Sequence, residues 1–271
     1  MRSRVLAALV SVLGSLGAAL ALAAPAAAAT GGPLFSPEQA GYVATGARFQ
    51  YVQSTVRLPN AADFASEVAG FGVSAQLWTK YRVVVLGVSN TTTAGNYNAA
   101  VAVFNRTTHA LICSTAGSGA QKCPNVGSRW TDGSVSFAPG DNVTMSIRYD
   151  RSTGADSFFA ADTTTGVTLS YGGYRPGTGK IYTQARVGAE FAASPWDTFT
   201  YNPPAAETHL VTFRNSVLVT YGGSQSTFSS WWTHHKIIAN STGSSIDPGH
   251  AEVMPHNLYN LGANFGVYLK P

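Results

Sequence analysis

Glu190 is the residue whose type and setting point most directly to chemistry. It lies in Ala185–Phe191, a stretch of mostly small and apolar residues that is typical of a buried strand. A carboxylate in such a strand is costly unless it is hydrogen-bonded, paired or used in a reaction. Glu190 is therefore a candidate functional residue. The structural alternative is an exposed side chain, or an ion pair with Arg186 or Arg214.

The histidines do not form a familiar metal site. His250 and Glu252 fall on one face of a short strand, His256 follows, and His234 and His235 are adjacent in sequence. None of these spacings is one used by zinc proteins. We therefore predict no metal and no cofactor, and expect these histidines to be exposed or hydrogen-bonded.

Three other chemistries are disfavoured by what surrounds the residues. Ser74 lacks the second glycine of a nucleophile elbow, so a serine triad is not expected. A glycosidase needs two carboxylates across a groove, whereas Asp197 and Glu207 lie in loops. Trp231-Trp232 would suit either a sugar-stacking platform or core packing, because adjacent strand residues face opposite sides.

The N-terminal 29 residues resemble an export signal. Arg2 and Arg4 precede an apolar run, and Ala27-Ala28-Ala29 forms a cleavage site before Thr30. We expect a signal peptide at 1–29, a single domain at 30–271, and a secreted, extracellular protein; the alanine-rich signal suggests a bacterial host. Without the two signal arginines, 15 basic residues face 13 acidic ones, which is no nucleic-acid footprint. No later stretch is apolar enough to span a membrane.

Cys113 and Cys123 are the only cysteines in the chain. In an exported protein two cysteines ten positions apart predict a disulfide that closes a short loop, worth on the order of 3 kcal/mol.

Short β-branched and aromatic runs alternate with Gly, Pro, Asn and Asp, and no helical period persists after the signal. The predicted strands are 49–58, 68–77, 81–88, 97–104, 142–149, 157–162, 167–171, 185–191, 211–213, 217–221 and 265–269. About a dozen strands without helices predict two packed antiparallel sheets. The fold class is therefore all-β.

Several motifs recur in an order known from one enzyme family. They are Ala40-Gly41-Tyr42-Val43, Tyr51-Val52-Gln53-Ser54-Thr55 with Pro59, Pro139-Gly140-Asp141, Thr164-Thr165-Gly166, Ala189-Glu190-Phe191 and Val211-Thr212-Phe213. Together they resemble the glutamic peptidases, or eqolisins, from about Ala40 to Phe213. The resemblance implies a concanavalin A-like double-sheet β-sandwich of the jelly-roll type whose concave face holds the substrate.

That family hydrolyses peptides with a Glu as general base and a Gln that stabilises the oxyanion. Glu190 matches the family's Glu, although another register would place Arg186 there. The distance to Val211 favours Glu190. Where the family has Gln-x-Gly-Val, this chain has Val85-Leu86-Gly87-Val88, so the catalytic Gln is missing. Groove tryptophans are also missing, at Gln39 and along 97–104.

Another donor would have to replace that Gln, since one lost oxyanion donor costs a factor of 10²–10³ in rate. Gln76 on the neighbouring strand is the candidate catalytic partner, and Gln39, Gln53 and Gln184 are the alternatives. The expected groove-binding residues are Gln39, Gln53, Tyr97 and Phe191.

Two functions remain open, so the sequence does not decide whether the protein is an enzyme. One is a monomeric, secreted peptidase-like hydrolase that uses Glu190 and acts at acid pH. The other is a non-catalytic relative whose concave groove binds an extended peptide or glycan. A side-chain amide within about 6 Å of Glu190 would favour hydrolysis, because a general base and its partner must both reach the reacting group.

Overall fold

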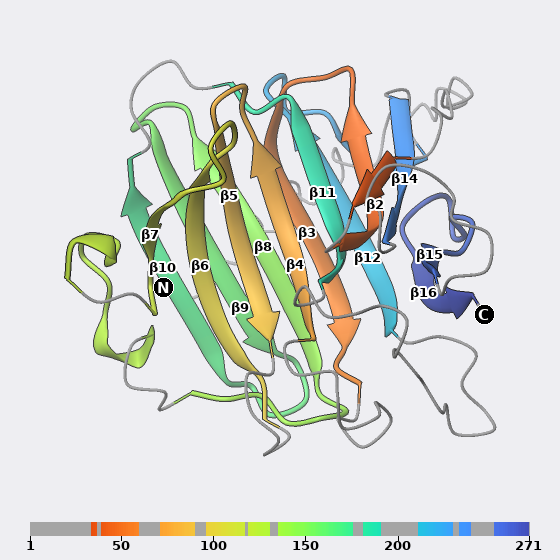
Figure 1. The fold of residues 1–271 in the computed structure, drawn as a ribbon, viewed down its shortest axis with the longest axis horizontal. Coiled ribbons are helices and arrows are strands. Elements are labelled where there is room, and N and C mark those ends of the chain that lie inside the picture. Colours follow the sequence, from red (N-terminus) through yellow and green to blue (C-terminus); the bar gives the residue numbers. More distant parts are fainter. Residues whose placement is uncertain are drawn as a thin grey trace, which may run out of the picture.

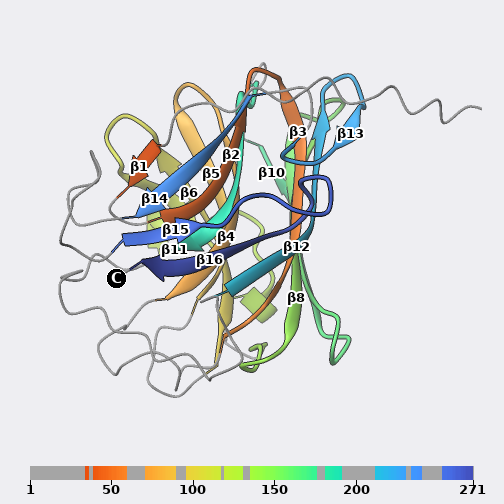
Figure 2. The same cartoon turned by 90° about the vertical axis from the view of Figure 1, so that its right-hand side faces the viewer.

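The computed structural model describes residues 34–36, 39–59, 71–89, 96–116, 119–130, 135–175, 181–190, 211–229, 233–239 and 252–270. The expected signal at 1–29 lies outside them. Two packed layers of mainly antiparallel strands build this part of the chain, as Figures 1 and 2 show. Its helices are two 3-10 turns, η2 (Gly119–Gln121) and η3 (Ser128–Trp130). Neither is long enough to cross a membrane.

One layer, here called the front layer, carries Glu190. Its strands, in hydrogen-bonded order, are β14 (Thr233–Ala239), β2 (Gln39–Thr45), β11 (Gln184–Glu190), β4 (Gly72–Trp78), β5 (Arg82–Ser89), β6 (Asn98–Asn105) and β7 (Leu111–Ser114). The short β1 (Leu34–Ser36) pairs with β14 in parallel. All other pairs within this layer are antiparallel.

The second layer, here called the back layer, packs behind the first (Figure 2). Its strands are β10 (Thr168–Tyr174), β9 (Ala155–Asp162), β8 (Asn142–Asp150), β3 (Phe49–Arg57) and β12 (Val211–Thr220), and β13 (Gln225–Ser226) pairs with β12. Two further strands, β15 (Glu252–Pro255) and β16 (Phe265–Lys270), join β14 to β12 by hydrogen bonds. The hydrogen-bonded path therefore runs from one layer into the other.

The alternation of residues along each strand fixes which face is core. In β11, Ala185, Val187 and Ala189 are fully buried and point between the layers. There β3 packs against both β11 and β4, and it contributes the fully buried Val52 and Val56. Because successive strand side chains face opposite sides, the even-numbered residues of β11 face away from this core. Glu190 is one of them, so its side chain also points away from the core.

The predicted strands match most of those observed to within a few residues, and the all-β sandwich is confirmed. One prediction was wrong: 211–213 and 217–221, expected as two strands, form the single strand β12. Its pairing with β3 skips from Arg214 to Val217, and Asn215 has a φ of 52°. The residues between the two predicted strands therefore form a bulge within a continuous strand.

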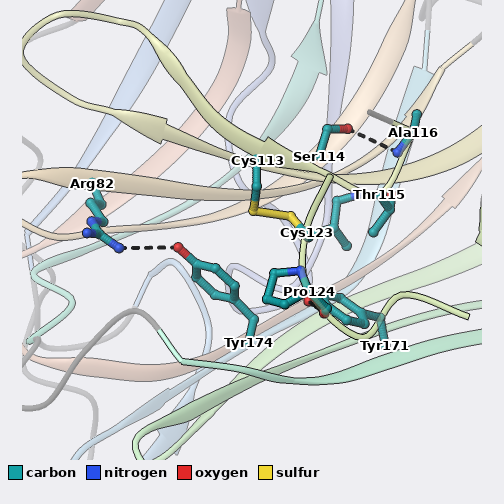
Figure 3. Close-up of a disulfide and its surroundings, with 10 residues drawn as sticks. Arg82, Cys113, Ser114, Thr115, Ala116, Cys123, Pro124, Tyr171 and Tyr174 are labelled. Carbon is teal, nitrogen blue, oxygen red and sulfur yellow. Dashed lines mark hydrogen bonds between the residues drawn. A yellow bond between two sulfur atoms is a disulfide. The ribbon is translucent and has the colours of Figure 1, made fainter. Parts of the chain in front are cut away.

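The predicted disulfide between Cys113 and Cys123 is present (Figure 3), with their Cα atoms 4.9 Å apart. Cys113 lies on the edge strand β7, and Cys123 follows η2. The next residue, Pro124, accepts a hydrogen bond from the hydroxyl of Tyr171 at 2.7 Å (Figure 3). Since Tyr171 lies on β10, the disulfide ties the edge of the front layer to a loop held by the back layer.

Candidate active site

Glu190 is the last residue of β11, and its neighbours are set by strand register. It lies opposite Gln39 of β2 on one side and Gly72 of β4 on the other. Its side chain points to the outer face of the front layer and is half-buried, whereas Ala189 is fully buried in the core. The carboxylate is therefore at a surface that a substrate can reach.

Two side chains of β4 donate hydrogen bonds to the same oxygen of this carboxylate. The distance to Glu190 Oε1 is 2.5 Å from Gln76 Nε2 and 2.5 Å from Ser74 Oγ. Gln76 Nε2 also donates to Ser74 Oγ, at 3.1 Å. Ser74 is fully buried and Gln76 is 5% exposed. Polar groups buried this deeply must be hydrogen-bonded, and here they satisfy one another around a carboxylate.

The orientation of the Gln76 amide is fixed by Trp78. The indole Nε1 lies 2.6 Å from Gln76 Oε1. An indole N–H can only donate, so the atom that it contacts must be the amide oxygen. The NH₂ group of Gln76 consequently faces Glu190. Residues 74, 76 and 78 alternate on one strand, which is why all three side chains share the outer face.

Beside this network, two neighbouring strands carry glycine at paired positions. Gly41 of β2 and Gly188 of β11 are paired. A Cβ on Gly41 would lie 2.2 Å from the Val187 carbonyl oxygen, and one on Gly188 would lie 2.5 Å from that of Ala40. Both strands come too close for any other residue at these positions. Gly188 also lies opposite Ser74 of β4, so Gly41, Gly188 and Ser74 form one row of small residues across three strands.

A cavity of about 470 Å³ opens over this surface. Strands β2, β4, β5, β6 and β11 and the turn after β6 supply its lining, which consists of Gln39, Gln76, Trp78, Val83, Val85, Phe104, Asn105, Arg106, His109, Arg186 and Glu190. The lining combines aromatic and aliphatic side chains with a few polar groups, as ligand sites usually do. Glu190 is the one acidic residue among these lining residues.

Arg186 is the most deeply placed cation of the cavity. Its guanidinium stacks on the Trp78 ring at 3.6 Å, and its Nη2 donates to Gln184 Oε1 at 2.9 Å. Burial, and next the positive charge of Arg106, lower its pKa to about 10. It therefore remains a cation at any pH near neutrality. Arg106 approaches the same indole, with its guanidinium carbon 5.2 Å from the ring centroid.

The residues predicted for the groove are only partly together. Gln76 and Gln39 line the cavity with Glu190, and Gln184 binds Arg186 at its edge. Gln53 does not, because it lies on β3 of the back layer, where it accepts a hydrogen bond from Tyr51. Tyr97 does not either: it is fully buried, and its hydroxyl donates to the Pro59 carbonyl at 3.0 Å. It was expected in the groove because 97–104 resembles a groove strand of the family, whereas its ring packs in the core.

Other predicted residues lie outside the described part of the chain: Phe191, Trp231, Trp232, Asp197, Glu207 and His250. Of the two arginines considered as partners of Glu190, Arg214 is exposed on β12 of the back layer. His234 and His235 are adjacent in β14, where they pair with Ala44 and Val43, and adjacent strand residues point to opposite faces.

Three site residues were not predicted: Ser74 as a donor to Glu190, Trp78 as the residue that orients Gln76, and Arg106. In the predicted strand, Ser74, Gln76 and Trp78 alternate with apolar residues, so the three share one face. That pattern could have suggested that Ser74 and Trp78 lie beside Gln76. Nothing in the sequence places Arg106 there, because a turn carries it over the sheet.

The fold is similar to that of solved glutamic peptidases. It superposes on scytalido-glutamic peptidase bound to a transition state analog inhibitor with a TM-score of 0.58 at 13% identity, covering 87% of this chain and 100% of that one. The protein has the glutamic-peptidase fold. A second structure with this fold is SCP-B, a member of the eqolisin family, in a complex with the tripeptide Ala-Ile-His; its TM-score is 0.56 at 13% identity, over the same shares of the two chains.

The sequence itself matches no protein-family model and no curated protein. The glutamic-peptidase fold is thus shared at an identity too low to carry residue roles across. Val85 is directly opposite Gln76 in the pairing of β4 with β5. The Gln76 amide and Val85 therefore share one row of the sheet, on adjacent strands.

Proposed function

We propose that this protein is a secreted peptidase-like hydrolase in which Glu190 is the general base and Gln76 stabilises the oxyanion. The observation that supports this most is the 2.5 Å separation of Gln76 Nε2 and Glu190 Oε1. It brings an amide donor and a carboxylate, the pair that the chemistry needs, into one cavity. The predicted signal and the disulfide support an extracellular location.

The reaction consumes one water. Glu190 takes a proton from the water as the water oxygen attacks the carbonyl carbon of the peptide bond. The carbonyl oxygen becomes an oxyanion, which accepts a hydrogen bond from the Gln76 amide. Glu190 then gives its proton to the amide nitrogen, the C–N bond breaks, and a carboxylic acid and an amine are released.

The resting hydrogen bonds allow this exchange. Of the two N–H groups of Gln76, one binds Glu190 and the other reaches Ser74 Oγ at the longer distance of 3.1 Å. The second N–H is the one that we expect to turn to the substrate oxygen. Ser74 keeps its own bond to Glu190 Oε1 throughout, which holds the carboxylate in place. Trp78 keeps the amide facing the right way.

The test is proteolysis of denatured proteins by the purified protein between pH 2 and 8. Wild type should cleave, with its best rate at acid pH, and Glu190→Gln should lose this activity while its circular dichroism stays unchanged. Asp150→Asn, at the exposed end of β8, is the matched loss of one carboxylate and should cleave like wild type. Equal activity of wild type and Glu190→Gln would remove Glu190 from the mechanism.

A second function is favoured by one feature. Glu190 Oε1 already accepts two short hydrogen bonds, so the polar network is closed without a substrate. A closed network suits a groove that binds an extended peptide or glycan without cleaving it. If wild type cleaves nothing across this pH range, yet binds such ligands, this second function replaces the first.

A further inference from the structure

We propose that the cavity beside Glu190 recognises a carboxylate of the bound peptide through Arg186 and Arg106, which makes the protein selective for acidic peptides. This inference rests on the proposed function in that it assigns the substrate class of the same site. The carboxylate could belong to an Asp or Glu side chain or to the C-terminus of the peptide. Both sources offer the same planar anion.

Arg186 has a donor that no described residue uses. Its stacking on Trp78 and its bond to Gln184 fix the plane of the guanidinium. Within the described part of the chain, its buried Nε has no hydrogen-bond partner. A guanidinium carries five N–H donors, and a carboxylate can accept two of them side by side. A buried donor without a partner is costly, so a bound anion would relieve it.

Arg106 adds a second cation to the cavity lining. Its Nη1 donates to the Thr79 carbonyl oxygen at 3.0 Å, which anchors the side chain near the Trp78 ring. Two guanidinium groups therefore approach one indole, and the positive charge of Arg106 is one of the causes that lower the pKa of Arg186. A carboxylate between them would replace this repulsion by attraction.

The acid of the cavity does not already fill this role. Glu190 is the one acidic lining residue, and its Oε1 accepts from Ser74 and Gln76. The bonds of Arg186 and Arg106 described above go instead to a neutral amide and a backbone carbonyl. The charge of Glu190 also attracts Arg186, but two guanidinium groups face this one carboxylate in the lining, which leaves a net positive charge for an acidic group of the peptide.

The geometry also limits where the acidic group sits on the peptide. Arg186 precedes Glu190 by four residues on the same face of β11. With a rise of about 3.3 Å per residue, their Cα atoms are roughly 13 Å apart, and the arginine side chain spans part of that distance. An extended peptide would therefore place its carboxylate about two to four residues from the bond beside Glu190.

The test compares peptides that differ by one group. Fluorogenic peptides with a single Glu at each of four positions on either side of the cleaved bond are paired with Gln versions, and each is made with a free and an amidated C-terminus. At one position, Glu should raise kcat/KM over Gln about ten-fold or more, as expected for hydrogen bonds to a charged group. An advantage of the free C-terminus instead would identify the terminal carboxylate as the source.

Variants separate this pocket from general charge effects. Arg106→Gln should bring the Glu-to-Gln ratio toward one, and Arg106→Glu should reverse it in favour of Lys peptides. Lys80→Gln removes an exposed cation outside the cavity and should leave the ratio unchanged. Cleavage with equal kcat/KM for all paired peptides would overturn the inference and leave the proposed function intact.

If no peptide is cleaved, the proposed function fails and the same pairs are measured by fluorescence anisotropy for binding. Tighter binding of Glu or free-terminus peptides, lost in Arg106→Gln, would support the carboxylate pocket on its own. Equal Kd values for each pair would overturn it.

Discussion

Trp78 donates its indole N–H to the side-chain oxygen of Gln76 at 2.6 Å, and this bond decides what Gln76 can do. A glutamine amide can face either way, and the two orientations present opposite chemistry. With the oxygen held by Trp78, the NH₂ group is directed at Glu190. In the reverse orientation two oxygens would face each other, and the proposed oxyanion donor would be lost.

Replacing Trp78 by Phe should therefore impair the proposed reaction more than the fold. We expect kcat to fall about 10- to 100-fold, since the amide loses its fixed orientation, while KM for neutral peptides changes less. Trp130→Phe is the matched control: Trp130 is buried, and its indole N–H likewise donates a hydrogen bond, to the Ser170 carbonyl oxygen at 2.9 Å, away from the cavity. Equal losses of kcat in both variants would show that Trp78 has no orienting role.

The opposition of Gln76 and Val85 across β4 and β5 suggests an exchange of the two side chains. Gln76→Val should lower kcat/KM by about 10²–10³, the usual cost of one oxyanion donor. The double variant Gln76→Val/Val85→Gln should recover part of that loss, because it returns an amide to the same row of the sheet. Steady-state kinetics on one peptide measures both.

Val85→Gln alone is the control for this exchange, since it keeps Gln76 and adds a second amide. A double variant no more active than Gln76→Val would mean that the position on β4 is essential, and not merely an amide near Glu190.

Gly188 should tolerate no side chain. Its added Cβ would lie 2.5 Å from the backbone oxygen of Ala40, and backbone cannot move aside as a flexible side chain can. We expect Gly188→Ala to lower the free energy of unfolding by about 2–3 kcal/mol, the range of overpacking in a well-packed sheet. Denaturant unfolding measures this.

Gly87→Ala is the matched control, because a Cβ there meets nothing closer than 4.0 Å and Gly87 also lies in a front-layer strand. Equal stability of the two alanine variants would contradict the close approach of β2 and β11.

His234 should make the fold sensitive to acid. Burial, and next the charge of His235, lower the pKa of His234. Its ring lies 6.0 Å from that of Tyr42, and its buried Nδ1 has no hydrogen-bond partner in the described chain. Since the folded-state pKa is below that of the unfolded chain, the unfolded state binds the proton more readily. His234 therefore contributes fully to the stability of the fold above about pH 6.5, and this contribution is lost as the pH falls.

The measurement is Tm at pH 7 and at pH 5. His234→Phe keeps a ring beside Tyr42 and should show a smaller fall in Tm than wild type. His109→Asn removes one exposed histidine, at a φ of 57° that Asn accepts. The Tm of this variant should fall as much as that of wild type. A fall in His234→Phe as large as that of wild type would place the acid sensitivity elsewhere.

The sequence alone determined the strand content, the disulfide and the direction of Glu190. Each of these depends on neighbours along the chain: the alternation of Ala185, Val187 and Ala189 with polar positions, and two cysteines ten residues apart. Two groove residues expected from the family resemblance were wrong: the ring of Tyr97 lies in the core, and the strand of Gln53 belongs to the back layer.

Only the tertiary structure decided which groups meet Glu190. Gln76 is 114 positions away from it, and the register of β11 on β4 brings the two together with Ser74. Register depends on hydrogen bonds and packing along whole strands, so no local pattern specifies it to one residue. The same holds for Arg106 and Arg186, which reach one indole from a turn and a strand. The two arginines are close only in the folded sheet, because only there do the turn after β6 and strand β11 lie beside the same tryptophan.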